Sequence, residues 1–177
     1  MLKDEIFGKA VFIKPSEECV SPCFFGSFHA SENVKTEIVI CGLGFFKLFI
    51  NGNAASDDYF APVTSFYHRQ ENCYATLNFG EEMNSRIYAV KYDISHLVHS
   101  GINDISVSVG IGWYGEFSKD CVLCYKITSG NDVTYSDTDI KWNTGPLTYY
   151  NIHLGEKQDY ASNLFDLNGF STADRKN

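Results

Sequence analysis

Short stretches rich in β-branched and aromatic residues, separated by turn residues, are the feature that most restricts the fold of this chain. Several of them alternate apolar with polar residues, as a half-buried strand does. We predict strands at 22–30, 36–41, 45–50, 86–94, 103–109, 121–127 and 132–138. The turn residues between them are Gly42, Asn51-Gly52, Ser100-Gly101, the glycines of 110–115 and Ser129-Gly130-Asn131. This spacing is typical of antiparallel sheets.

Helical sequence is confined to one short segment. Residues 95–101 predict a helical turn, with Ser95 as its N-cap and Gly101 just beyond its end. A turn of this length cannot cross over between parallel strands, which excludes a doubly wound α/β fold. We therefore expect an all-β fold, a two-sheet antiparallel β-sandwich of the jelly-roll or galactose-binding-domain-like kind. A chain of 177 residues predicts a single domain, residues 1–177.

Composition and charge exclude several classes of protein. Hydrophobic residues make up 44% of the chain and charged residues 20%, which is typical of a folded domain. A net charge of −8 without a dense Lys/Arg cluster argues against a nucleic-acid partner. Apolar runs are too short for a signal peptide or a membrane span, so we expect no membrane partner and a cytoplasmic location for the chain as given.

The six cysteines are interpreted as free thiols in a reducing compartment, because a chain of this size and hydrophobic content does not depend on a disulfide framework. Cys121 and Cys124 form a Cys-x-x-Cys, but residues three apart in a strand point to opposite faces. Since no second Cys or His pair stands at zinc-finger spacing, a structural role is favoured over zinc or redox chemistry.

Three segments, 42–69, 88–115 and 141–162, together carry a resemblance to a known family. Their motif residues, in chain order, are Asn51-Gly52, Asp57-Asp58, Pro62, Tyr67, Tyr92-Asp93, Gly101, Asn103, Gly112-Trp113-Tyr114 and Asp159-Tyr160. In this order they resemble the N-terminal β-sandwich domain of bacterial α-L-rhamnosidases of glycoside hydrolase family 78. The match extends over nearly the whole chain.

The chain departs from the family pattern at three places. Val63-Thr64 stand where the family usually has Gly-Trp, residues 72–84 look inserted, and the final Tyr and Asp are inverted. The first departure puts in doubt any ligand contact made by that Trp.

The resemblance implies an accessory domain with no active site of its own, packed beside a catalytic helical barrel that is absent from this chain. Some sandwich modules of this type hold rhamnose through a calcium ion. The resemblance thus implies a carbohydrate partner, L-rhamnose or a related sugar, with calcium as the cofactor. The alternative is a purely structural domain that shapes the neighbouring catalytic domain and binds no free sugar.

Five residues are candidates for the sugar site: Asp57, Asp58, Tyr67, Trp113 and Tyr114. Adjacent carboxylates on a loop suit a calcium ion, so Asp57 and Asp58 are also the candidate metal ligands, with a solvated acidic turn as the alternative. Trp113 and Tyr114 lie between two glycines, as an exposed platform for a sugar ring would. Because the preceding run is apolar, core packing of Trp113 is favoured over the platform, and packing is favoured for Tyr67.

No catalytic motif is present: the sequence has no Gly-x-Ser-x-Gly, His-Glu-x-x-His or catalytic-cysteine signature. His96 and His99 lack a third ligand, so a structural or exposed pair is favoured over a metal site. A hydrolase, the third hypothesis, would need two facing carboxylates. We expect structural roles for Asn103 in bonding local backbone, for Asp93 in capping the turn after it, and for Trp142 in the core.

Overall fold

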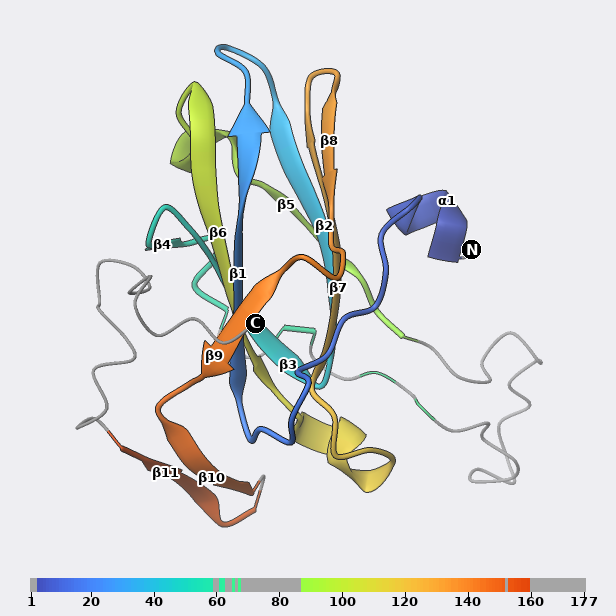
Figure 1. Ribbon diagram of the computed structural model, residues 1–177, viewed down its shortest axis with the longest axis vertical. Coiled ribbons are helices and arrows are strands. Elements are labelled where there is room, and N and C mark those ends of the chain that lie inside the picture. The colour runs from blue at the N-terminus through green and yellow to red at the C-terminus, as the bar shows by residue number, and fades with distance from the viewer. Residues whose placement is uncertain are drawn as a thin grey trace, which may run out of the picture.

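Two antiparallel sheets face each other in the computed structural model (Figure 1). The structure describes residues 3–58, 61–62, 65, 67, 87–151 and 153–159. Several positions discussed above lie outside these residues: Val63-Thr64, the expected insertion at 72–84 with Cys73, the first residue of the strand predicted at 86–94, and Tyr160.

The larger sheet has five strands in the order β4-β3-β6-β1-β9, and the smaller has four in the order β5-β2-β7-β8. The strands of the larger sheet are β1 (Pro22–Ala30), β3 (Phe45–Ile50), β4 (Asn53–Ala54), β6 (Gly101–Gly110) and β9 (Lys141–Thr144). Those of the smaller sheet are β2 (Thr36–Leu43), β5 (Val90–Asp93), β7 (Val122–Ser129) and β8 (Asp132–Tyr135). The predicted all-β sandwich is confirmed.

Every strand predicted from the sequence has a counterpart, and two of them, β1 and β3, have the predicted bounds. The prediction missed the short β4, the edge strand β9 and a separate hairpin formed by β10 (Leu147–Asn151) and β11 (Gly155–Gln158). These strands have two to five residues each, too few for apolar alternation to be recognised.

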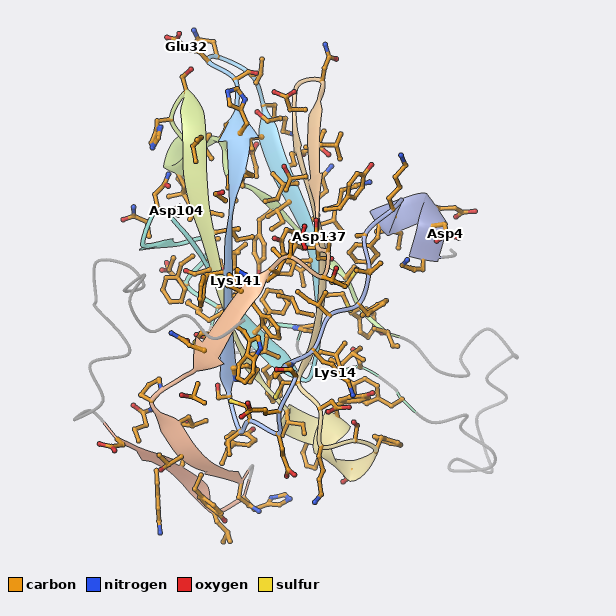
Figure 2. All side chains as sticks on the ribbon, in the orientation of Figure 1. Asp4, Lys14, Glu32, Asp104, Asp137 and Lys141 are labelled. Carbon is orange, nitrogen blue, oxygen red and sulfur yellow. The ribbon has the colours of Figure 1, made fainter. Side chains whose placement is uncertain are left out.

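The core lies between the sheets because strand residues alternate between two faces. In β3, burial alternates residue by residue from Phe45 to Ile50. Side chains fill the space between the sheets (Figure 2). The core includes Phe24 and Phe28 of β1, Ile38 and Ile40 of β2, Phe46, Leu48 and Ile50 of β3, Ile105, Val107 and Val109 of β6, Leu123, Tyr125 and Ile127 of β7, and Trp142 of β9. The core role predicted for Trp142 is confirmed.

A second apolar cluster lies on the outer face of the smaller sheet, beneath a helix that the sequence analysis missed. Helix α1 (Lys3–Phe7) buries Phe7 against Leu43, Cys41 and Cys124. Five residues are too few to form a stable helix alone, so packing on the sheet holds this one. None of the helices in the described ranges is long and apolar enough to cross a membrane.

The cysteines behave as the sequence predicted. None of the five that the structure describes forms a disulfide. Cys121 belongs to the inter-sheet core and Cys124 to the outer cluster, so the two residues of the Cys-x-x-Cys face opposite sides of the sheet. Burial raises the pKa of Cys23, Cys41 and Cys121 to about 12.

The connection from β5 to β6 carries the turn predicted at residues 95–101, in a shorter form. A 3₁₀ turn, η2, spans Ser95–Leu97. The prediction of Ser95 as the N-cap is wrong. The Ser95 hydroxyl accepts a hydrogen bond from the Thr36 N–H, and Asp93 provides the local cap. The Asp93 carboxylate accepts from the Ser95 N–H at 3.0 Å and from its hydroxyl at 2.6 Å, as predicted for Asp93.

Asn103 fixes the end of this connection from a position that is 1% exposed. Its side-chain oxygen accepts hydrogen bonds from the His99 N–H and the Asn51 amide. Its own amide donates to the carbonyls of His99 and Gly101. The predicted bonding of local backbone is confirmed, and the same side chain also joins the turn after β3 to the start of β6.

We predict that Asn103→Ala lowers the free energy of unfolding by about 2–4 kcal/mol, because the N–H and carbonyl of His99, the Gly101 carbonyl and the Asn51 amide each lose a hydrogen bond. Urea unfolding followed by circular dichroism measures the change. The matched control is Ile102→Ser, whose side chain is 70% exposed and which should change stability by less than about 0.5 kcal/mol. Equal losses in the two variants would contradict the role of Asn103.

Because three thiols are buried, we predict that the free energy of unfolding falls at alkaline pH. Their folded pKa of about 12 lies above the unfolded value, so folding favours the protonated thiol. This contribution is complete below about pH 8.5 and is lost as pH rises, by up to about 1.4 kcal/mol per pH unit for each thiol. Urea unfolding between pH 7 and 10 should show the decline, and Cys121→Ala should reduce its slope. A flat profile would contradict it.

Candidate functional site

An open cleft of about 410 Å³ lies at one end of the sandwich. The helical turn η3 (Gly112–Glu116), yellow in Figure 1, and the β10–β11 hairpin lie at this end, opposite the turn between β1 and β2. Glu32 marks that opposite end in Figure 2. The cleft is lined by Glu18, Cys19, Val20, Ile111, Gly112, Trp113, Gly115, Glu116, Ser118, Lys119, Tyr150, Asn151 and His153. We call it the Trp113 cleft.

The turn η3 forms where β6 ends, and a glycine allows its close approach to β3. Gly112 has a φ of +50°, and a Cβ on it would stand 2.8 Å from the Phe45 ring. A side chain at this position would therefore be strained and would clash. The N–H groups of Tyr114 and Phe117 donate to the carbonyls of Ile111 and Tyr114 and close the turn.

The aromatic residues of this turn point to two different surroundings. Tyr114 and Phe117 pack on the Tyr67 ring, with centroids 4.9 and 5.5 Å away. The Tyr67 hydroxyl accepts a hydrogen bond from the Gly44 N–H at 2.9 Å, and burial raises its pKa. These three rings form a structural cluster, so packing, the favoured role of Tyr67, is what the structure shows.

Trp113 instead faces the cleft. It is 38% exposed, and its ring meets the His153 ring edge-on at 5.5 Å between centroids. The core packing favoured for Trp113 is therefore wrong, because the 3₁₀ geometry directs it away from the inter-sheet layer that Trp142 fills. The exposed platform, the other alternative for Trp113, is the one observed.

The hairpin supplies one wall of the cleft. The Asn151 carboxamide accepts hydrogen bonds from the N–H groups of His153 and Leu154, both at 2.9 Å, and so fixes the turn that presents the imidazole. Tyr150 lines the same wall, and burial together with the nearby Glu156 raises its pKa. The sequence analysis missed Tyr150, Asn151 and His153 because no predicted strand covers them.

The opposite wall comes from two loops held together by charge and by sulfur contacts. Lys14 and Asp120 form an ion pair at 2.8 Å, and Lys119 stands 3.8 Å from Glu18. The Cys121 thiol contacts the Val20 carbonyl at 3.6 Å. These contacts position Glu18 and Val20 at the edge of the cleft.

Asp57 and Asp58 do not line the Trp113 cleft. Their loop is held by Lys47, whose ammonium donates to the carbonyls of Ser56 at 2.6 Å and Asp58 at 2.9 Å. The Asp58 carboxylate accepts from the Ser56 hydroxyl at 3.0 Å. Among the residues described, no group of three or more His, Cys, Asp or Glu side chains could hold a metal ion.

The Lys47 ammonium thus binds the carbonyl oxygens of Ser56 and Asp58, which a calcium ion at this loop would need as ligands. Calcium needs six to eight oxygen ligands, and the positive charge of Lys47 beside them opposes its binding. The donor set of this loop does not fit calcium, and calcium binding here stays an untested prediction. Of the five residues proposed from the sequence, Trp113 alone lines the cleft.

Comparison with known proteins supports the resemblance found in the sequence. No protein-family model matches the chain. It is 28% identical over 149 residues to an alpha-L-rhamnosidase of Formosa agariphila, a match that covers 73% of this chain and 14% of that protein. The chain thus spans about one seventh of the curated relative.

Solved structures agree in fold. An α-L-rhamnosidase of Aspergillus terreus matches 89% of this chain and 19% of its own, with a TM-score of 0.69 and 22% identity. The Streptomyces avermitilis α-L-rhamnosidase complexed with L-rhamnose matches 87% of this chain and 15% of its own, with a TM-score of 0.69 and 17% identity. In sequence and in fold the chain is similar to one part of α-L-rhamnosidases, among them members of glycoside hydrolase family 78, as the sequence predicted.

The two tryptophans allow a direct test of this geometry. Trp113 is 38% exposed and Trp142 is 5% exposed, so acrylamide should quench the first far more strongly. We expect Trp142→Phe to keep the quenchable fluorescence and Trp113→Phe to lose it, as read by Stern–Volmer plots. Equal quenching in the two folded variants would place Trp113 in the core.

Proposed function

We propose that this chain is a non-catalytic accessory domain of an α-L-rhamnosidase-like glycoside hydrolase, and that it binds L-rhamnose or a related sugar in the Trp113 cleft. The observation that carries the proposal is the exposed Trp113 ring at the edge of a cleft that also contains charged and hydroxyl groups. The relatives of the chain are α-L-rhamnosidases, and it covers only a small share of their length.

The chemistry of the cleft suits a pyranose. Sugars present C–H groups that pack on aromatic rings, and hydroxyls that need hydrogen-bonding partners. Trp113 and Tyr150 supply the rings, while Glu116, Ser118 and Lys119 supply donors and acceptors. A volume of about 410 Å³ is in the range of small-molecule sites.

Two apolar residues of the cleft favour a 6-deoxy sugar. Val20 and Ile111 line it beside the polar groups, and Val20 is 39% exposed. L-rhamnose carries a methyl group where most hexoses carry a hydroxymethyl. Burying that methyl on Val20 and Ile111 would be favourable by roughly 0.8 kcal/mol, whereas a hydroxyl there would lose water without gaining a partner.

The carboxylates of the cleft suit binding better than hydrolysis. A glycosidase needs a general acid in an apolar setting, facing a second carboxylate across the scissile bond. Glu18 and Glu116 are both exposed to solvent, and Glu18 stands 3.8 Å from Lys119. Hydrolysis of rhamnosides is proposed for the parent protein rather than for this domain.

The test is calorimetric titration with L-rhamnose. We expect Trp113→Ala to weaken binding at least about tenfold, which corresponds to 1.4 kcal/mol. The matched control is Tyr149→Ala, because Tyr149 is an aromatic residue of the hairpin with 39% exposure that does not line the cleft. Binding in that variant should equal the wild type.

Titration with and without calcium distinguishes the Trp113 cleft from the Asp57-Asp58 loop as the sugar site. With Lys47 on the loop carbonyls, we expect excess EDTA and the Asp57→Ala/Asp58→Ala pair to leave rhamnose binding unchanged. Binding that needs calcium and is lost in the double variant would move the site to that loop. No heat from a folded protein would overturn the sugar proposal and leave the purely structural role.

A further inference from the structure

A second cleft, of about 320 Å³, lies on the outer face of the larger sheet. The outer residues of β1, β3 and β6 form its floor, and the β10–β11 hairpin forms its wall. The lining residues are Ser21, Cys23, Phe45, Phe46, Lys47, Ser108, Val109, Gly110, Pro146, Leu147, Tyr150, Glu156 and Gln158. We call it the sheet-face cleft.

The two clefts adjoin at three separate points of the chain. Val20 lines the Trp113 cleft and Ser21 the sheet-face cleft; Ile111 lines the first and Gly110 the second. Tyr150 lines both. Three segments that are distant in sequence thus pass from one cleft to the other within a single residue, so the two clefts are neighbours that share Tyr150.

A polar row crosses four strands of the larger sheet, and three of its members, Lys47, Ser108 and Cys23, line the sheet-face cleft. Cys23 pairs with Ser108, Ser108 with Lys47, and Cys23 with Asn143. Residues paired directly across antiparallel strands share a face, so all four side chains lie on the outer face of the sheet. The Cys23 thiol and the Ser108 hydroxyl are 3.1 Å apart.

Asn143, at the β9 end of the row, is buried and does not line the cleft. It is 1% exposed, and neither its side-chain nitrogen nor its oxygen has a hydrogen-bond partner. An unpaired buried amide costs about 1–3 kcal/mol for each group. At the hairpin wall, Gln158 donates to Glu156, so polar groups border the groove on this side as well.

We propose that the Trp113 cleft and the sheet-face cleft form one groove for an oligosaccharide, with Tyr150 at the junction between sugar units. This inference rests on the proposed function and extends it from a single sugar to a chain. The first unit packs on Trp113. The next units run over Tyr150 and lie against the Phe45 ring and the hydroxyl of Ser108.

A substitution at Gly110 can fill the sheet-face cleft and leave the Trp113 cleft open. It pairs with Phe45 on the outer face, and a Cβ on it would meet no atom within 4 Å. Gly110→Phe therefore places a ring in the sheet-face cleft without a clash at the backbone. Gly110→Ala is the matched control, because a methyl group fills little of the cleft.

The experiment is calorimetric titration of each protein with L-rhamnose and with an α-linked L-rhamnose tetrasaccharide. We expect the wild type and Gly110→Ala to bind the tetrasaccharide at least roughly tenfold more tightly than the monosaccharide. Gly110→Phe should bind both sugars with the affinity that the wild type has for the monosaccharide. Gln158→Ala, a second variant that needs no added bulk, should lower tetrasaccharide affinity alone.

The possible outcomes distinguish failure of the oligosaccharide groove from failure of the proposed sugar-binding function. Equal affinity of the wild type for the two sugars overturns the groove and leaves the monosaccharide site intact. A tetrasaccharide gain that persists in both Gly110→Phe and Gln158→Ala also overturns it. If neither sugar binds the folded wild type, the proposed function itself fails.

Discussion

The inner faces of the two antiparallel sheets meet in a single apolar layer, and the position of every other feature depends on it. Period-two alternation in β1, β3 and β6 directs one set of residues into this layer and the next set outward. Trp142 of β9 fills this layer beside β1, whereas the chain leaving β6 enters the turn η3 at the end of the sandwich. That turn leaves Trp113 partly exposed.

The outward set of residues has a different role on each sheet. On the smaller sheet part of it is apolar and is covered by α1, through Phe7 against Cys41 and Cys124. On the larger sheet it includes a polar row from Lys47 to Asn143, of which Lys47, Ser108 and Cys23 line the sheet-face cleft. Part of one outer face is thus covered by packing, whereas the other has polar groups that line a cleft. The hairpin β10–β11 stands beside the second face and shapes both clefts.

Local sequence signals predicted the strands well and the candidate site poorly. β1 and β3 appear with their predicted bounds because alternation is a property of neighbouring residues. Asp93 and Asn103 were also predictable, since each acts mainly on backbone close to it in the chain. Trp113 was assigned to the core from its apolar neighbours, but a 3₁₀ turn does not continue the strand period. No local sequence pattern marked Tyr150 and His153 as site residues, because they lie some forty residues from Trp113 along the chain.

The sequence by itself determined the antiparallel sandwich, the free thiols and the relation to α-L-rhamnosidases, because period, turn chemistry and motif order are written along the chain. Only the tertiary structure decided which side chains share a surface. It placed Asp58 on a loop held by Lys47, outside the Trp113 cleft, and it brought Tyr150 to the boundary of two clefts. Such neighbours come from different strands and turns, and their meeting depends on how the sheets pack rather than on any local pattern.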